Sequence, residues 1–205
     1  MTMTTTTTTT VTTAATTDAQ VSHPNGTRFA RGLAPVDDLT RIRERALAAA
    51  RSVTDPEMPM LTLDDLGILR SVEVSDTGAV TVAITPTYTG CPAMATMRDD
   101  LVRVLREAGF ADVTIRVSLS PAWSSDWITE RGRQALADNG LSAPGPVPTR
   151  SGPIALSLKP IRRELHCPQC GSGAVELTSE FGPTACKALY RCSTCLEPFE
   201  HVKEI

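Results

Sequence analysis

Two Cys-x-x-Cys pairs near the end of the 205-residue chain constrain its fold more than any other feature. Each pair can turn two thiolates toward one point, and two pairs together complete a tetrahedral sulfur site. The 21 residues between the pairs slightly exceed the usual spacing, but they readily hold a β-hairpin. The sequence therefore predicts a four-cysteine metal site, with zinc expected and iron as the alternative. Its ligands are Cys167, Cys170, Cys192 and Cys195.

Residues 163–205 are predicted to form a zinc ribbon around this site, because a segment of about 40 residues usually needs a metal for stability. His166 and His201 could substitute as ligands, but four cysteines make them unnecessary. Apolar side chains are expected to cover the ribbon, namely Val175, Leu177, Leu189, Tyr190 and Phe199.

One cysteine of this region, Cys186, is left over by the metal site. The neighbouring Lys187 could lower its pKa and make it a reactive thiol. A buried structural cysteine in the ribbon hairpin explains it equally well, and the sequence leaves both interpretations open.

Charge and hydropathy exclude several classes of protein. The net charge of −3 is too near neutral to indicate a nucleic-acid or membrane surface, and no apolar run approaches the roughly 18 residues that span a bilayer. No secretory signal is visible at the N-terminus, and five of the six cysteines lie in the last 40 residues. Clustered cysteines in such a chain indicate metal rather than disulfides, so we expect a cytoplasmic protein.

The sixth cysteine, Cys91, stands alone between an alternating strand and a helix. Pro92 suits the first helical position, which would place Cys91 at or next to the helix N-cap. Free N–H groups and the helix dipole there would lower its pKa and make it a better nucleophile and metal ligand. The alternative is a small buried residue at a helix start.

Residues 35–140 are predicted to form an α+β domain with the order helix, strand, strand, helix, strand, helix. Apolar periodicity and turn residues set the expected elements. These are a helix from Asp37 or Asp38 to near Thr54, strands at 68–74 and 79–85, a helix from Pro92 to Gly109, a strand at 113–119, and a helix at 126–139.

Two segments carry no predicted element. Residues 1–34 open with a Thr/Ala-rich run that cannot bury enough apolar surface to fold, so a disordered tail is expected. Residues 141–162 hold five prolines and are interpreted as a linker. We therefore expect the ribbon to unfold separately from the α+β domain.

A rigid loop, Asp55-Pro-Glu57-Met-Pro59, brings two carboxylates to the end of the first helix. Loops of fixed geometry often carry function. Turn formation explains Asp55 equally well, so both interpretations stay open.

This acidic loop, the stretch Asp-Leu-Gly-Ile at 65–68 and the stretch Thr-Gly-Cys-Pro at 89–92 resemble the iron–sulfur assembly domain family, which includes SufT-like proteins. Two further segments, at 120–127 and 185–190, are similar to the D-subunit family of the bacterial phenylacetyl-CoA epoxidase system. The resemblance covers residues 36–205.

The resemblance implies a non-catalytic accessory protein of aerobic phenylacetate catabolism. The oxygenase of that system is a di-iron enzyme built from other subunits, and the D subunit assists assembly or repair of its metal centre. Cys91 matches the family's reactive cysteine, and Asp55 and Glu57 match its acidic loop. Cys91 would transiently bind iron or an iron–sulfur cluster, or engage a client thiol. The ribbon would dock the partner, either the oxygenase subunits or the iron–sulfur assembly machinery.

Three other functions compete with this accessory role. An enzyme could use Cys91 as nucleophile with Asp55 or Glu57 orienting a base, but the predicted α+β domain contains no histidine to act as that base. The ribbon could instead be an interaction module. A nucleic-acid-binding ribbon is disfavoured by the acidic charge balance and the few aromatic residues.

Overall fold

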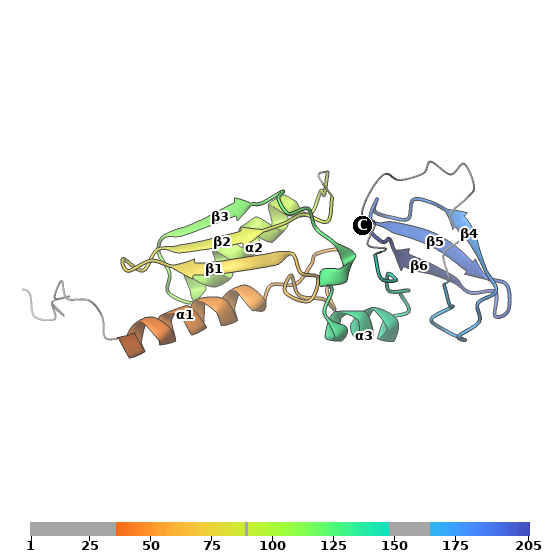
Figure 1. Cartoon of the computed structure of the whole chain (residues 1–205), viewed down its shortest axis with the longest axis horizontal. Coiled ribbons are helices and arrows are strands. Elements are labelled where there is room, and N and C mark those ends of the chain that lie inside the picture. The colour runs from red at the N-terminus through yellow and green to blue at the C-terminus, as the bar shows by residue number, and fades with distance from the viewer. Residues whose placement is uncertain (1–35, 89, 148–164) are drawn as a thin grey trace, which may run out of the picture. The chain divides into compact units, whose positions relative to one another are not determined.

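Helices and strands follow the predicted order in the computed structural model of the chain (Figure 1), which confirms the α+β class. The first part contains α1 (Val36–Arg51), β1 (Leu69–Val74), β2 (Val80–Ile84), α2 (Met94–Glu107), β3 (Val113–Val117), the 3₁₀ turn η1 (Ser125–Trp127) and α3 (Glu130–Asp138). The second part contains β4 (Val175–Ser179), β5 (Lys187–Cys192) and β6 (Pro198–Val202).

The structure describes residues 36–88, 90–147 and 165–205. The predicted tail, residue 89 of the cysteine loop and most of the predicted linker lie outside the described residues. In the described ranges, no helix has the length and apolar character required to cross a lipid bilayer.

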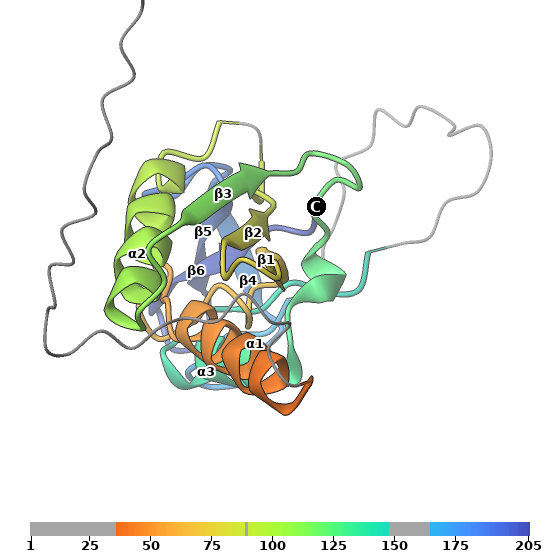
Figure 2. The same ribbon diagram turned by 90° about the vertical axis from the view of Figure 1, so that its left-hand side faces the viewer.

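The first sheet has the order β1-β2-β3, with β1 antiparallel and β3 parallel to the central strand β2. A parallel pair needs a crossover connection, and α2 supplies it. Helices α1 and α2 contact each other and lie against one face of the sheet (Figure 2). Every second residue of β2 is buried on that face: Val80, Val82 and Ile84.

The core of this domain forms where the two helices meet the sheet. Met97, Leu101 and Leu105 form an apolar stripe along α2 and are almost completely buried. Ala46 and Ala50 of α1 are also fully buried, which allows the two helices to approach closely. The first helix is shorter than predicted and ends at Arg51.

The last helix is divided where one continuous helix was predicted. Ser124 accepts a hydrogen bond from the Asp126 N–H and caps only η1. Ile128 then adopts an extended conformation and buries its side chain, and Thr129 caps α3 through the Gly132 N–H. The chain is held extended at this point because the Thr129 N–H donates to the Asp65 carbonyl at 2.8 Å.

The second sheet is an antiparallel meander in the order β4-β5-β6. The rings of Tyr190 and Phe199 are stacked with centroids 5.9 Å apart and are buried, as predicted. Leu177 was expected in this core, but it is 46% exposed because its strand β4 lies at the edge of the sheet. Val175 and Leu189 are half-buried.

The end of the chain is joined to the α+β domain by backbone hydrogen bonds and by packing. The Ser142 N–H donates to the Glu200 carbonyl at 2.8 Å, and the Val202 N–H donates to the Ser142 carbonyl at 3.0 Å. The Val202 side chain is buried in the core of the first domain. The Ser125 N–H donates to the carbonyl of Ile205 at 3.0 Å.

Candidate functional site

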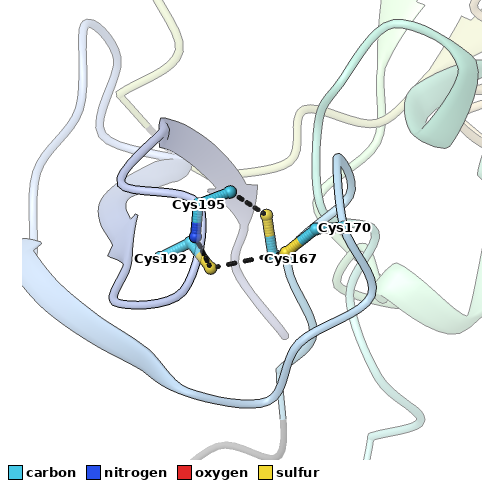
Figure 3. A group of neighbouring side chains, drawn as sticks. All are labelled: Cys167, Cys170, Cys192 and Cys195. Carbon is cyan, nitrogen blue, oxygen red and sulfur yellow. Dashed lines mark hydrogen bonds between the residues drawn. The ribbon is translucent and has the colours of Figure 1, made fainter.

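The four cysteines of the two Cys-x-x-Cys pairs form one cluster, with all sulfur atoms within 4.8 Å of one another (Figure 3). The Cys167–Cys195 and Cys170–Cys192 sulfur pairs are each 3.6 Å apart. Four metal–sulfur bonds of about 2.3 Å in a tetrahedron place the sulfur atoms about 3.8 Å apart, whereas a disulfide needs about 2.05 Å. The cluster therefore fits a four-coordinate metal ion rather than two disulfides.

Backbone N–H groups of the second pair point at one of these sulfur atoms. The N–H groups of Cys195 and Thr194 donate to the Cys192 sulfur and lower the pKa of that thiol to about 6. The Glu197 N–H also favours a thiolate at Cys195, but burial and the neighbouring thiols raise the pKa of Cys195 to about 12. Because metal ligation requires thiolates, a bound cation must displace protons here, and metal affinity rises with pH.

His201 does not belong to this cluster. It is fully buried, with Nδ1 3.1 Å from the Ser142 hydroxyl and Nε2 3.3 Å from the Glu204 carboxylate. Among the described residues, the four cysteines are the only group of three or more His, Cys, Asp or Glu side chains whose ligand atoms lie close enough together to hold a metal ion. The histidines considered as substitute ligands are thus not part of it.

Cys91 lies in a turn before α2 and not at its N-cap. The helix begins at Met94 after Ala93, and no side chain caps it. Burial raises the pKa of Cys91, the Ala93 N–H opposes this increase, and the carboxylates of Glu57 and Asp55 raise the pKa further. The predicted lowering of this pKa is therefore wrong, because desolvation and nearby negative charge outweigh the helix start.

A cavity of about 20 Å³ lies beside Cys91. Residues that are far apart in the sequence line it: Asp55, Glu57, Met58, Leu66, Ile68, Thr87, Cys91, Met97, Trp123, Cys186 and Val202. One water molecule needs about 10–15 Å³ on this measure. The cavity thus has room for a single ion or a water molecule, and an organic substrate does not fit in it.

Asp55 has a turn-forming role and also faces this cavity. Its Oδ1 accepts hydrogen bonds of 2.8 Å from the N–H groups of Glu57 and Met58. Its Oδ2 receives no hydrogen bond from any described residue. Burial raises the pKa of Asp55 despite the two bonds to Oδ1. The structure thus brings both acidic-loop residues to the same cavity as Cys91.

Cys186 reaches the same cavity from the ribbon. Its thiol is buried and lies 3.1 Å from the Thr184 hydroxyl. Burial raises its pKa, and Lys187 only partly opposes this effect. The Lys187 ammonium is instead paired with Glu200 at 2.7 Å. The structure favours a buried cysteine over a thiol activated by Lys187.

Trp123 lines the cavity, and Asp65 holds the loop before Leu66 through Thr62, Thr129 and Arg131; the sequence alone indicated neither role. Asp65 is buried, and hydrogen bonds from Thr62 together with the Arg131 guanidinium lower its pKa although burial opposes them. The Trp123 indole N–H donates to the Leu66 carbonyl at 2.8 Å, which holds its ring in the cavity wall. The Trp-containing stretch 120–127 was singled out only by resemblance.

Two family models match the chain. Residues 43–117 match the model described as iron–sulfur cluster assembly protein, and residues 155–203 match the PaaD zinc beta ribbon domain.

Curated relatives agree with both models. A protein from Escherichia coli K12, named as the putative D subunit of 1,2-phenylacetyl-CoA epoxidase, is 42% identical over 160 residues, which cover 76% of this chain and 89% of that protein. A Porphyromonas gingivalis Fe-S protein maturation auxiliary factor is 32% identical and covers 49% of this chain and 95% of its own length. A DUF59 domain structure from Bacillus anthracis is 22% identical with a TM-score of 0.44, and it covers 47% of this chain and 92% of its own.

Proposed function

The chain belongs to the PaaD family of 1,2-phenylacetyl-CoA epoxidase D subunits, and from this membership we propose that it is an accessory protein that assists maturation of the epoxidase metal centre. The similarity of its first domain to Fe-S protein maturation factors supports this assignment. Its partners are then the oxygenase subunits or the iron–sulfur assembly machinery, and its pathway is aerobic phenylacetate catabolism.

The observation that carries the proposal is the small cavity shared by Cys91, Asp55 and Glu57. A thiolate together with carboxylate oxygens is a donor set that accepts iron. Burial and the two carboxylates hold the Cys91 thiol protonated in the absence of a cation. Arrival of a metal ion reverses this balance, because the cation displaces the thiol proton and pairs with the negative charge. We assign to Cys91 the transient binding of an iron ion as cargo, because the cavity has room for one ion and not for an iron–sulfur cluster.

The four-cysteine cluster has a separate, structural role in this proposal. The match to the zinc-ribbon family model and the complete set of four thiols both favour zinc as the permanently bound metal. Zinc would hold together the two Cys-x-x-Cys pairs, between which β4 and β5 are formed. It would thereby stabilise a ribbon that presents a docking surface to the partner.

A cysteine-dependent enzyme is the competing function. A cysteine nucleophile needs a nearby base, and the cavity of Cys91 has no histidine among its described lining residues. The raised pKa of Cys91 and the size of the cavity also disfavour nucleophilic attack on an organic substrate. These observations favour the accessory role.

Replacement Cys91→Ser tests the proposal. Serine is nearly isosteric, so the chain should fold, and the variant should lose its support of growth on phenylacetate. The di-iron oxygenase purified from the same cells should contain less iron than with the unmodified chain. Met94→Leu, a volume-conserving change in the same segment, serves as control and should retain growth. Normal growth and normal iron content with Cys91→Ser would remove the functional assignment.

A further inference from the structure

Cys91 and Cys186 are 95 positions apart in the chain, yet both line the cavity beside α2. Cys91 comes from the loop after β2, whereas Cys186 comes from the turn before β5. We propose that Cys186 is a second thiolate ligand of this cavity, so that one thiophilic divalent metal ion binds between the α+β domain and the ribbon. This inference rests on the proposed function, since it takes Cys91 to be a cargo ligand.

The position of Cys186 is fixed by hydrogen bonds within the ribbon. The Gly182 N–H donates to the Lys187 carbonyl at 2.8 Å, which closes the turn that carries the thiol. The Lys203 N–H donates to the Cys186 carbonyl at 3.0 Å. Val202, next to Lys203, is buried in the domain core and lines the same cavity. Docking of β6 therefore places the Cys186 thiol at the cavity that Cys91 lines.

Negatively ionising groups converge on the cavity. It is lined by two thiols and by the carboxylates of Asp55 and Glu57. Asp55 is 5% exposed, and its Oδ2 has no hydrogen-bond donor in the described part of the chain. The Lys187 ammonium pairs with Glu200 at 2.7 Å, and its charge only partly offsets the effect of burial on Asp55 and Cys186. Two thiolates with carboxylate oxygens suit Fe²⁺, Co²⁺ or Zn²⁺.

The two cysteine sites differ in how well they are preformed. The four-cysteine cluster already has its sulfur atoms at ligand spacing, whereas the described donors around the cavity do not form a similarly close group of three or more. A metal ion in the cavity must draw its ligands together, and this reorganisation lowers the affinity. Weak binding suits an ion that is to be passed on, and the volume of about 20 Å³ suits one ion rather than a cluster.

Anaerobic titration with Co²⁺ tests the inference on the full chain with zinc in the ribbon, since sulfur-to-cobalt charge-transfer absorption grows with the number of thiolate ligands. We expect one cobalt ion to bind in addition to the ribbon zinc, with two thiolates among its ligands. Cys186→Ser and Cys91→Ser should each lower the absorption per bound cobalt to about half, from two thiolates to one, and the double variant should abolish it. Serine at 186 can keep the hydrogen bond to Thr184. Thr184→Val keeps both thiols and, as the matched control, should keep the full absorption.

Full absorption per cobalt in Cys186→Ser would overturn the composite site. If Cys91→Ser alone still lowered the absorption, the proposed cargo role of Cys91 would stand without Cys186. A cobalt signal independent of Cys91 would instead count against the proposed function itself. Zinc content is measured in every variant to verify the ribbon. X-ray absorption of cobalt in the unmodified chain needs no variant, and fewer than two sulfur ligands there would also overturn the inference.

Discussion

Cys91 shows where sequence reasoning about a single residue succeeds and where it fails. The loop that carries this thiol, and the acidic loop that faces it, could be identified as short motifs. The direction of its pKa could not, because that depends on burial and on carboxylates placed by the tertiary structure. The short distance in sequence to a helix start was misleading, since the helix begins three residues later.

Alkylation of Cys91 should therefore be slow at neutral pH. A thiol whose pKa is raised remains protonated at pH 7, and its reaction with iodoacetamide should accelerate only above the ordinary thiol pKa of about 8.5. Glu57→Gln removes one neighbouring negative charge, so it should shift the midpoint to lower pH. The pH–rate profile, followed by mass spectrometry of the Cys91 peptide, measures both effects.

Glu73→Gln on the exposed part of β1 is the matched control and should leave the profile unchanged. A midpoint below pH 8.5 for the unmodified chain would contradict the desolvated environment of Cys91.

At the scale of elements, periodicity predicted the order of the helices and strands. It predicted neither the division of the last helix nor the way in which the 64–67 loop holds the segment around the start of α3. Gly67 has φ +66°, and a Cβ there would lie 2.5 Å from the Cβ of Trp127. The Gly132 backbone passes close to the same loop, where a Cβ would be 3.0 Å from the Asp65 carbonyl. These contacts join residues about 60 positions apart, so no local sequence pattern predicts them.

Gly67→Ala should destabilise the protein more than Gly78→Ala. Both glycines have positive φ, which costs alanine about 1–2 kcal/mol, partly offset by the lower entropy of the unfolded chain. A Cβ at Gly78 meets nothing within 4 Å, whereas a Cβ at Gly67 clashes with Trp127 and adds an overpacking cost of about 1–3 kcal/mol. Urea unfolding followed by circular dichroism gives the two free energies. Equal losses would mean that the close approach at Gly67 is relieved without cost.

For the whole molecule, the sequence predicted a ribbon and an α+β domain but not their junction. The proline-rich composition after residue 140 indicated separate units, and the predicted boundaries at 140 and 163 remain predictions. Ser142 nevertheless pairs with β6, and Val202 is buried in the core of the first domain. The sequence around a single apolar residue near the chain end does not indicate that this residue packs in the core of a distant domain. For the same reason, the cavity that Cys91 and Cys186 share could not be predicted from the sequence.

Removal of the ribbon metal should therefore destabilise the α+β domain, contrary to the separate unfolding expected from the linker composition. Both tryptophans, Trp123 and Trp127, lie outside the ribbon, so their fluorescence reports the first domain. Chelation, or the variant Cys170→Ser, should lower the thermal midpoint of the tryptophan transition by roughly 6–12 °C, because undocking Val202 forfeits about 1.5–3 kcal/mol of burial.

Val202→Ala separates docking from metal binding. In the metal-loaded protein this variant should lower the tryptophan midpoint while retaining the metal, because the four cysteine ligands are unchanged. Subsequent chelation should then cause a smaller further decrease than in the unmodified chain, since part of the contact is already lost. A tryptophan transition unaffected by chelation would show that the two parts unfold independently. The second thiol could not then be held at the cavity by docking of β6, so this outcome would also weaken the composite metal site.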